Sequence, residues 1–419
     1  MNEKNLQEIA YRRQAFKFFD RGKSTHQILH QIPRSRSWLF KWKRRFSRDG
    51  WKALDSSAKT PKSSPHAYEP SLRHLVLRVR GRLERAKVGL IGARAVRSEL
   101  QRKRLVKTLP SISTIKRWLR AAGFFHSDSE PEVKAYYPTP QFPAEWLFVS
   151  CDWLARYLEG GTKVFVFHTI DHHTHALDQT ISTVKTTEAA CAHLLHSLTE
   201  LGVPDFLQID NDAAFTGLGK KRRVFGRFVR LALHFGIELL FIPPAEPKRN
   251  SVVERVNGLW VSSFWEKDHF TSLRDLLKKR EKFLKWYEQD YAPPALQGLR
   301  VKEASGKRHR RKLRCREVES VPEELPMTEG RIHFVRRVGA DGRIEILKER
   351  WRVSKSLRGE YVWATINLSQ KCLIIYHRRS AKATAKMIKQ YAYKIEEKVS
   401  KLPPRYRRSK KRVSVLQII

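Results

Sequence analysis

Cysteine, acidic residues and long apolar stretches are all scarce in this sequence of 419 residues. No run of 18 or more apolar residues occurs, so we expect neither a membrane-spanning helix nor a membrane partner. The first residues are charged and lack an apolar core, so we do not expect a secretion signal. The few cysteines are too widely spaced for a disulfide framework or a CxxC zinc site, which favours a reducing compartment. The four cysteines are Cys151, Cys191, Cys315 and Cys372.

Acidic residues are outnumbered two to one, because 42 Asp and Glu face 84 Lys and Arg and the formal net charge is +42. A surplus of this size indicates a polyanionic partner, and nucleic acid is the first candidate. Aromatic residues are plentiful, with 11 Trp, 12 Tyr and 21 Phe, so the chain can build folded cores. A disordered basic tail is therefore excluded, and the length suggests about three domains.

The positive charge is unevenly distributed. Residues 1–120 carry a net charge of +23 and residues 301–419 a net charge of +20, whereas residues 121–150 carry −3 and residues 151–300 carry +2. A ribosomal-type protein would carry its charge throughout. The nearly neutral centre instead favours a catalytic or assembly core that is held to DNA by basic flanks.

Residues 1–55 predict a helix-turn-helix domain of three short helices. The first spans about residues 6–19, Thr25 can cap the second, and Ser35 can cap a basic third helix over about residues 36–47. This third helix keeps its aromatic side chains on one face, so its cations point outward and we expect them to contact DNA. The alternative is a small three-helix domain with a solvated basic face. The expected DNA-binding residues are Arg36, Lys41, Arg44 and Arg45.

A second helix-turn-helix domain is predicted over residues 71–123, after a linker rich in Pro and Ser. Its helices are expected at about residues 72–85, 93–103 and 113–122, with Ser111 or Ser113 as the cap of the last. Two such domains would read a long DNA site. Residues 1–150 contain no cysteine, which excludes a zinc module of the cysteine type in this part. The outward cations of the last helix, expected on DNA, are Lys116, Arg117 and Arg120.

Residues 144–302 predict a mixed α/β core, because strand and helix patterns alternate from Trp146 onward. The expected strands span about residues 146–153, 163–171, 176–184, 206–210 and 236–244. The expected helices span about residues 187–201 and 221–235, and a last helix begins near Lys248.

Three carboxylates occupy the ends of these elements. Asp152 and Asp210 each stand where a strand is expected to end, and Glu254 lies in the first turns of the last helix. Carboxylates that converge on one sheet edge repel one another unless cations lie between them, and hard oxygen ligands suit Mg²⁺ or Mn²⁺. Two such ions would activate a hydroxyl and stabilise the leaving oxygen in a phosphodiester exchange.

These carboxylates stand in motifs that resemble the D…D…E signature of retroviral-type integrases and of the related bacterial insertion-sequence transposases. The motifs are CDW at 151–153, QIDNDAAF at 208–215 and AEPKRNSVVERVNG at 245–258. The segment 286–304 looks like the region that closes this core, and the order of parts is similar throughout. The sequence departs from the family at Ile209, Asp212 and Ser251, and its spacing between Asp210 and Glu254 is longer than is usual.

The resemblance implies a ribonuclease-H-like core in which Asp152 is shared by two ions while Asp210 and Glu254 bind one each. It implies a DNA transposase that binds its element's terminal repeats, exposes a 3′-OH and joins it to target DNA. We expect a homo-oligomer on double-stranded DNA in a bacterial cytoplasm, associated with the nucleoid. The rivals are a catalytically silent, domesticated DNA-binding protein and a stand-alone nuclease of the same fold. All three acids are present, which counts against the silent protein.

Other residues near the carboxylates leave alternatives open. Asp212 could replace Asp210, although a turn is expected there, and Asp171 could support Asp152 or cap a turn. The segment DHHTH at 171–175 suggests zinc, but satisfied histidines are the more common reading. Residues 220–223 are basic and could contact DNA or form a solvated helix face.

The start of the last core helix supplies further expected DNA contacts. Lys248 and Arg249 lie where the helix dipole favours phosphate, and Asn250 is the expected N-cap. Arg255 and Asn257, one and three positions after Glu254, are also expected to touch DNA.

The C-terminal third follows a charged linker. Short alternating strands over residues 326–380 predict a small all-β barrel that docks on DNA or on a partner subunit. Residues 381–419 predict a basic tail, helical and then low in structure. Its segment RYRRSKKR at 405–412 is expected to grip phosphates, with a localisation signal as the alternative.

Overall fold

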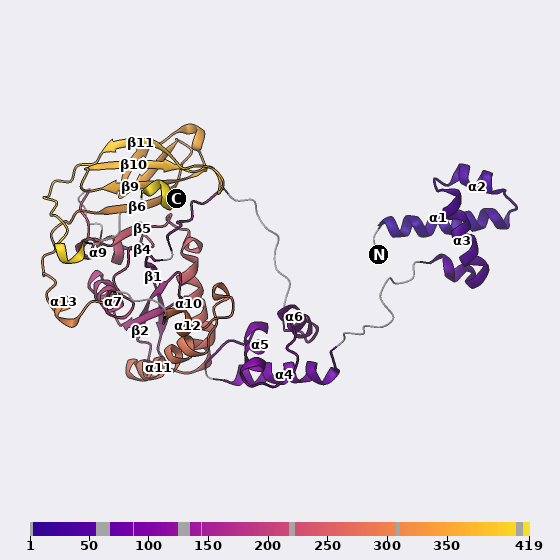
Figure 1. Cartoon of the computed structure of the whole chain (residues 1–419), viewed down its shortest axis with the longest axis horizontal. Helices are drawn as coiled ribbons and strands as arrows, with labels where there is room; N and C mark the ends of the chain where they lie inside the picture. Colours follow the sequence, from indigo (N-terminus) through magenta and orange to yellow (C-terminus); the bar gives the residue numbers. More distant parts are fainter. Residues whose placement is uncertain are drawn as a thin grey trace. The chain divides into compact units, whose positions relative to one another are not determined.

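The computed structural model describes residues 3–55, 68–86, 88–124, 135–143, 145–217, 223–306, 311–407 and 414–419. The chain divides into two compact units, Met1–Pro70 and Ser71–Ile419, which Figure 1 shows in sequence colours. In the part of the chain that is described, no helix is both long and apolar enough to cross a membrane.

The smaller unit is helical. Its elements are α1 (Glu3–Asp20), α2 (Thr25–Gln31), α3 (Arg36–Asp49) and the 3-10 turn η1 (Gly50–Leu54). Ser35 caps α3 by accepting a hydrogen bond from the backbone of Trp38, as expected, whereas α2 is capped by Ser24 and not by Thr25. The helices close around a small apolar core, and the expected DNA-binding cations of α3 are exposed.

A second group of helices opens the larger unit. It consists of α4 (Pro70–Arg85), α5 (Ala93–Arg102) and α6 (Ile112–Ala121). Val76, Leu100 and Leu119 are buried between them, and Ser111 caps α6. The three cations expected on DNA from α6 are exposed.

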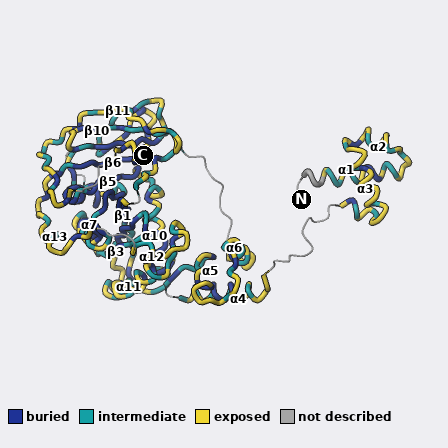
Figure 2. The backbone as a smooth tube through the Cα atoms, in the orientation of Figure 1, coloured by how far each residue is buried: buried dark blue, intermediate teal, exposed yellow. Residues whose placement is uncertain are grey.

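A mixed sheet of nine strands forms the centre of the larger unit, with the order β11-β10-β9-β6-β5-β4-β1-β2-β3 (Figure 1). Its first five strands are β1 (Phe148–Tyr157), β2 (Lys163–Asp171), β3 (Leu177–Ser182), β4 (Phe206–Ile209) and β5 (Glu238–Phe241). The remaining strands are β6 (Arg331–Arg337), β9 (Tyr361–Asn367), β10 (Cys372–His377) and β11 (Lys386–Ala392). Strands β4 and β5 are buried along their whole length, and Figure 2 shows the central strands in dark blue.

Helices cover the faces of this sheet. Those of the first half are α7 (Thr187–Glu200), α8 (Ala213–Thr216), α9 (Arg227–His234), α10 (Ser251–Ser263) and α11 (Leu273–Gln289). Helices α7 and α9 pack on one face, and α10 and α11 pack on the other face of β1 and β2. Later short helices are α12 (Val301–Ser305), α13 (Cys315–Glu319) and α14 (Val415–Ile418). The 3-10 turns are η2 (Pro247–Asn250), η3 (Trp265–Lys267), η4 (Pro294–Leu296), η5 (Lys355–Leu357) and η6 (Pro404–Tyr406).

The expected separate C-terminal barrel is wrong. Strand β6 pairs in parallel with β5, with Phe241 opposite Phe334, and β9 to β11 extend the same sheet. An uncovered β5 would expose a row of unpaired backbone groups, and β6 removes that edge. The rings of Phe241 and Phe334 stack with centroids 5.0 Å apart, so the two halves share one core. Only β7 (Arg343–Ile346) and β8 (Glu349–Arg352) form a separate ribbon among the described strands.

The expected basic tail also differs. Residues 386–392 form strand β11 instead of a helix, and Val415 and Ile418 of α14 are buried against Trp146 and Phe148. The apolar residues that end the chain therefore belong to the core of the sheet. The basic segment 405–412 lies largely outside the described residues.

Strand β1 runs further than expected. It continues five residues beyond Asp152 to Tyr157, because it pairs with β2 from Val149 to Tyr157 and Tyr157 lies opposite Lys163, where β2 starts. Asp152 therefore stands in the middle of a strand and opposite His168. Helix α9 begins at Arg227, later than the expected start near residue 221, and residues 218–222 lie outside the described residues.

Candidate active site

Three neighbouring elements bring Asp152, Asp210 and Glu254 together. Strands β1 and β4 are parallel neighbours with Ser150 opposite Gln208, so Asp152 within β1 and Asp210 directly after β4, each two residues further on, lie side by side. Glu254 is in the first turn of α10, which packs on β1 and β2 through an apolar face. All three side chains line one cleft of about 640 Å³.

The carboxylates affect one another electrostatically. Burial, together with the negative charges of Asp210 and Glu254, raises the pKa of Asp152 to about 8. Burial also raises the pKa of Asp210, and the charges of Asp212 and Glu254 add to the effect. Clustered acids whose charged forms are disfavoured are an arrangement that a cation would stabilise.

The donor set fits Mg²⁺ or Mn²⁺, since it consists of carboxylate oxygens. Within the described residues, no three His, Cys, Asp or Glu side chains form a closed metal-binding group. Mg²⁺ sites that act on phosphates do not need one, because the ion keeps waters and uses one or two carboxylates plus substrate oxygens. The three acids of the cleft would therefore hold the ions together with the phosphodiester.

Asp152 is held by a chain of hydrogen bonds that runs through Asn257 and His168 to Gln179. Its Oδ2 accepts from Asn257 Nδ2 at 3.0 Å, and Asn257 Oδ1 is 2.7 Å from His168 Nδ1. The ionised form of Asp152, which a bound cation would favour, can only accept hydrogen bonds. Asn257 therefore offers its NH₂ to Asp152 and its oxygen to His168. His168 then carries its proton on Nδ1 and accepts from Gln179 Nε2 at 2.6 Å. Burial lowers the pKa of His168 to about 4, which keeps the ring neutral.

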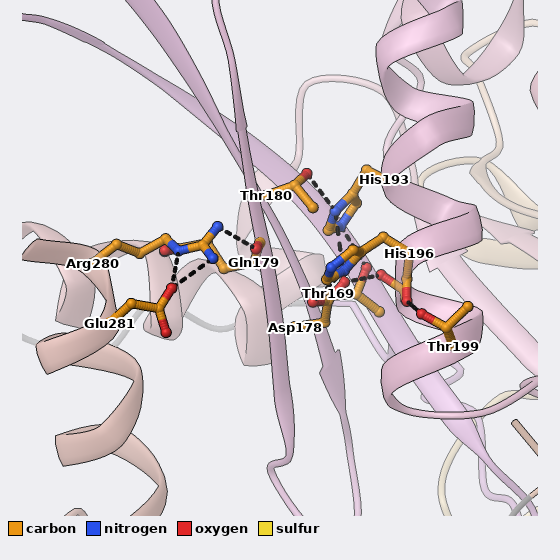
Figure 3. Close-up of polar contacts among 10 residues, drawn as sticks. Thr169, Asp178, Gln179, Thr180, His193, His196, Thr199, Arg280 and Glu281 are labelled. Carbon is orange, nitrogen blue, oxygen red and sulfur yellow. Dashed lines mark hydrogen bonds and ion pairs between the residues drawn. The ribbon is translucent and has the colours of Figure 1, made fainter. Parts of the chain in front are cut away.

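Strand β3 bonds to a helix on each of its two sides, as Figure 3 shows. On one side, Arg280 of α11 donates to the backbone carbonyl of Gln179 at 3.3 Å. On the other side, Asp178 accepts from Ser197 at 2.6 Å and contacts His196 at 2.9 Å, both on α7. The strand that supports His168 is therefore fixed from both faces.

Asn250 joins the start of α10 to the sheet. It occupies the expected N-cap position, but its side chain does not cap the helix. Its Nδ2 instead donates to the carbonyl of Cys151 at 3.2 Å, and its Oδ1 accepts from Gln208 at 2.9 Å. Asn250 thus sets the position of Glu254 relative to both strands that carry the aspartates.

The competing acids have structural partners. Asp212 caps α8 by accepting from the backbone of Ala214 at 2.9 Å, and it forms a 2.9 Å ion pair with Lys185. Asp171 accepts from the backbone N–H groups of His173 and Thr174, so it caps a turn. Neither acid lines the cleft, whereas Asp210 does.

The residues expected to contact DNA near Glu254 fall into two groups. Lys248 and Arg255 are exposed. Arg249 donates to Glu246 at 2.9 Å and to Tyr361 at 3.0 Å, and Asn257 is buried beside Asp152. Arg249 and Asn257 are thus occupied by contacts within the protein.

Arg156 is a cleft residue that the sequence reasoning missed. It lines the same cleft as the three acids, together with Trp153 and Glu266. The available signal was alternation along β1, since Asp152 and Arg156 are four residues apart and share a strand face. It was missed because β1 was expected to end near Asp152.

No family model and no curated protein matches this chain. Among solved structures, the catalytic core domain of HTLV-2 integrase in complex with magnesium is 17% identical, with a TM-score of 0.30, and the match covers 40% of this chain and 97% of that one. The catalytic core domain of BIV integrase is 15% identical with a TM-score of 0.28, covering 38% and 93%. A chain of the simian T-cell lymphotropic virus intasome in complex with PP2A regulatory subunit B56 gamma is 15% identical with a TM-score of 0.34, covering 72% and 99%. All these TM-scores are below 0.5.

Proposed function

We propose that this chain is a DNA transposase or integrase, a polynucleotidyl transferase that cleaves a DNA strand and joins the resulting 3′-OH to target DNA. The observation that carries the proposal is the cleft in which Asp152, Asp210 and Glu254 meet, where burial and the neighbouring negative charges raise the pKa of Asp152 and of Asp210. The three carboxylates would hold two Mg²⁺ or Mn²⁺ ions. When bound, the ions activate a hydroxyl and stabilise the leaving oxygen of an in-line displacement.

The residues of the chain supply position and binding. Asn257 orients Asp152 through its amide, and Asn250 ties the helix of Glu254 to β1 and β4. The exposed cations of α3 and α6 would bind the terminal repeats, and Lys248 and Arg255 would bind phosphates beside the cleft. Water and a DNA 3′-OH can serve in turn as nucleophiles at one such site. We propose that the protein acts as a homo-oligomer on DNA, in a bacterial cytoplasm and associated with the nucleoid.

Charge removal at the three acids tests the proposal. In Mg²⁺, Asp152→Asn, Asp210→Asn and Glu254→Gln should each lower strand transfer by roughly 1,000-fold or more, about 4 kcal/mol of transition-state stabilisation, while binding of the ends survives. Asp212→Asn should retain most activity, because Asn also serves as an N-cap. Each variant is assayed for cleaved and joined products on DNA that carries the element's ends.

The wild-type products separate the rival functions. A catalytically silent DNA-binding protein would bind the ends and yield no cleavage, and a stand-alone nuclease would cleave without joining. Normal activity of any one triad variant would remove that residue from the assignment, and loss in Asp212→Asn with normal activity in Asp210→Asn would exchange the two aspartates.

A further inference from the structure

The part of β1 beyond Asp152 carries a cation into the active cleft. Side chains alternate along a strand, so Asp152, Leu154 and Arg156 lie on one face of β1. Leu154 packs with the apolar side chains under α10, and Arg156 stands opposite Val164 of that core. The cleft is lined by Arg156 as well as by the three carboxylates.

Arg156 is half-buried, and most of its guanidinium N–H groups are not used in hydrogen bonds within the described residues. Its Nη1 donates to the carbonyl of Ala155 at 2.8 Å, which uses one of five guanidinium N–H groups. Over the described ranges of the chain, no carboxylate forms an ion pair with it. Lys185, by contrast, is paired with Asp212, and Arg249 with Glu246. Arg156 therefore places a positively charged guanidinium group with available N–H donors at the wall of an acidic cleft.

We propose that Arg156 binds a non-scissile phosphate of the DNA strand whose neighbouring phosphodiester reacts at the three carboxylates. This inference rests on the proposed function and adds a binding site for the substrate backbone. Arginine matches a phosphate with two parallel hydrogen bonds, which suits the fixing of a strand better than a point charge does. Asp152 and Arg156 are four positions apart on the strand, about 13 Å between Cα atoms, so the guanidinium meets a phosphate other than the reacting one.

A second hollow, which shares Glu266 with the active cleft, limits the path that the DNA backbone can take. It contains about 370 Å³ and is lined by acids together with Tyr157, Trp265 and Phe270. Its acids are Glu159, Glu266 and Asp268. Glu159 contacts His269 of the same hollow at 3.0 Å, and Asp268 is 3.6 Å from Lys279. Glu266, which lines both the hollow and the cleft, would repel a phosphate, so the backbone contact on this side of the cleft is expected to end at Arg156.

A neutral-phosphate scan of the full-length protein tests this contact. DNA ends are prepared with a single methylphosphonate at each position next to the scissile phosphate, and cleavage in Mg²⁺ is timed for each. Wild type should be slowed roughly 10- to 100-fold at one neighbouring position. Arg156→Gln should be slowed by a similar factor on unmodified DNA, with no further loss at that position and normal losses elsewhere.

Lys163→Gln is the matched control, because Lys163 is an exposed cation on β2 opposite Tyr157 and on the other sheet face. It should behave as wild type at every position. Arg156→Lys should cleave unmodified DNA at a rate between those of the wild type and Arg156→Gln. If Arg156→Gln lowers the melting temperature, Arg156→Lys replaces it as the variant that tests the contact.

The outcomes separate the two proposals. The Arg156 contact alone is overturned if the wild type cleaves DNA and each methylphosphonate slows Arg156→Gln by the same factor as it slows the wild type. A wild-type rate in Arg156→Gln overturns it as well. Absence of Mg²⁺-dependent cleavage by wild type on unmodified ends overturns the proposed function and the Arg156 contact with it.

Discussion

Asp152 accepts one hydrogen bond on each carboxylate oxygen, from the backbone N–H of Trp153 at 2.8 Å and from Asn257. A carboxylate has about four lone-pair sites, so these bonds orient the group and still leave capacity for a cation. Asn257 was identifiable from its place one turn after Glu254. Its role was not, because the sequence does not reveal that α10 lies against β1 with this amide facing a carboxylate.

Two histidines of α7, one turn apart, should respond to pH with opposite sign. Burial lowers the pKa of His193 to about 4, although Asp178 lies 3.8 Å away and opposes the shift. His193 is satisfied as a neutral ring by Thr169 and Thr180, each at 2.8 Å. His196 is half exposed, and its hydrogen bond to Asp178 raises its pKa. Figure 3 shows both rings beside Asp178.

The stability of the larger unit should therefore change in two ways. The contribution of His193 is present above pH 6.5 and is lost as the pH falls towards 4, by up to about 1.4 kcal/mol per pH unit. His196 contributes below pH 6.5, and its contribution is lost as the pH rises through its raised pKa. Thermal unfolding between pH 4 and 8 should show His193→Gln most destabilised at pH 8 and His196→Gln most destabilised at acid pH. Parallel curves for the two variants would contradict this assignment.

At the scale of elements, β6 supports the loop that carries Asp210. Arg336 of β6 donates to Asn211 Oδ1 at 2.7 Å and to the carbonyl of Ile242 at 2.8 Å, and Asn211 donates to the same carbonyl at 2.7 Å. Burial lowers the pKa of Arg336 to about 10. A buried guanidinium from the C-terminal strands thus fixes the residue that directly follows Asp210.

Arg336→Met should weaken both stability and chemistry. It keeps the apolar stem but removes a donor from Asn211 Oδ1 and from the carbonyls of Ile242, Val335 and Glu345, of which Ile242 keeps its bond from Asn211. The free energy of unfolding should therefore fall by roughly 2–4 kcal/mol. Cleavage at a temperature where the variant is folded should fall about tenfold, through the misplaced Asp210 loop. Arg337→Met is the control, since Arg337 is exposed and should change stability by less than about 0.5 kcal/mol. Equal melting of the two variants would remove Arg336 from this role.

Local sequence signals predicted where helices and strands lie better than they predicted which strands pair with one another. Ser35 and Ser111 are caps read from neighbouring residues, and β2 was expected with its observed bounds because alternation is a local pattern. The pairing of β5 with β6 joins Leu239 to Ile332, residues more than 90 positions apart, and no local pattern encodes that choice. Strands β6 to β10 were therefore recognised as strands and wrongly closed into a barrel, whereas β11 was expected to be helical.

At the scale of the whole molecule, the residues of the proposed chemistry all lie in one of the two compact units. Met1–Pro70 forms one unit, and residues 1–70 carry 16 Lys and Arg against 6 Asp and Glu. The three carboxylates and the whole nine-stranded sheet belong to Ser71–Ile419. Because the smaller unit has its own apolar core, its removal should leave the fold of the larger unit intact.

Two truncations should therefore behave differently. A chain of residues 71–419 should keep Mg²⁺-dependent cleavage of generic DNA but bind the ends more weakly. Its affinity should also depend less steeply on salt, since each lost phosphate contact lowers the slope of log affinity against log salt concentration by about 0.9.

A chain of residues 1–325 lacks β6 to β11, which leaves β5 as an open edge and exposes the apolar face around Phe241, so it should aggregate. Salt titration of end binding, thermal melting and the cleavage assay distinguish the two chains. If residues 1–325 folded and cleaved DNA at the full-length rate, the C-terminal strands would be dispensable to the catalytic sheet and the shared core would not be needed for its stability.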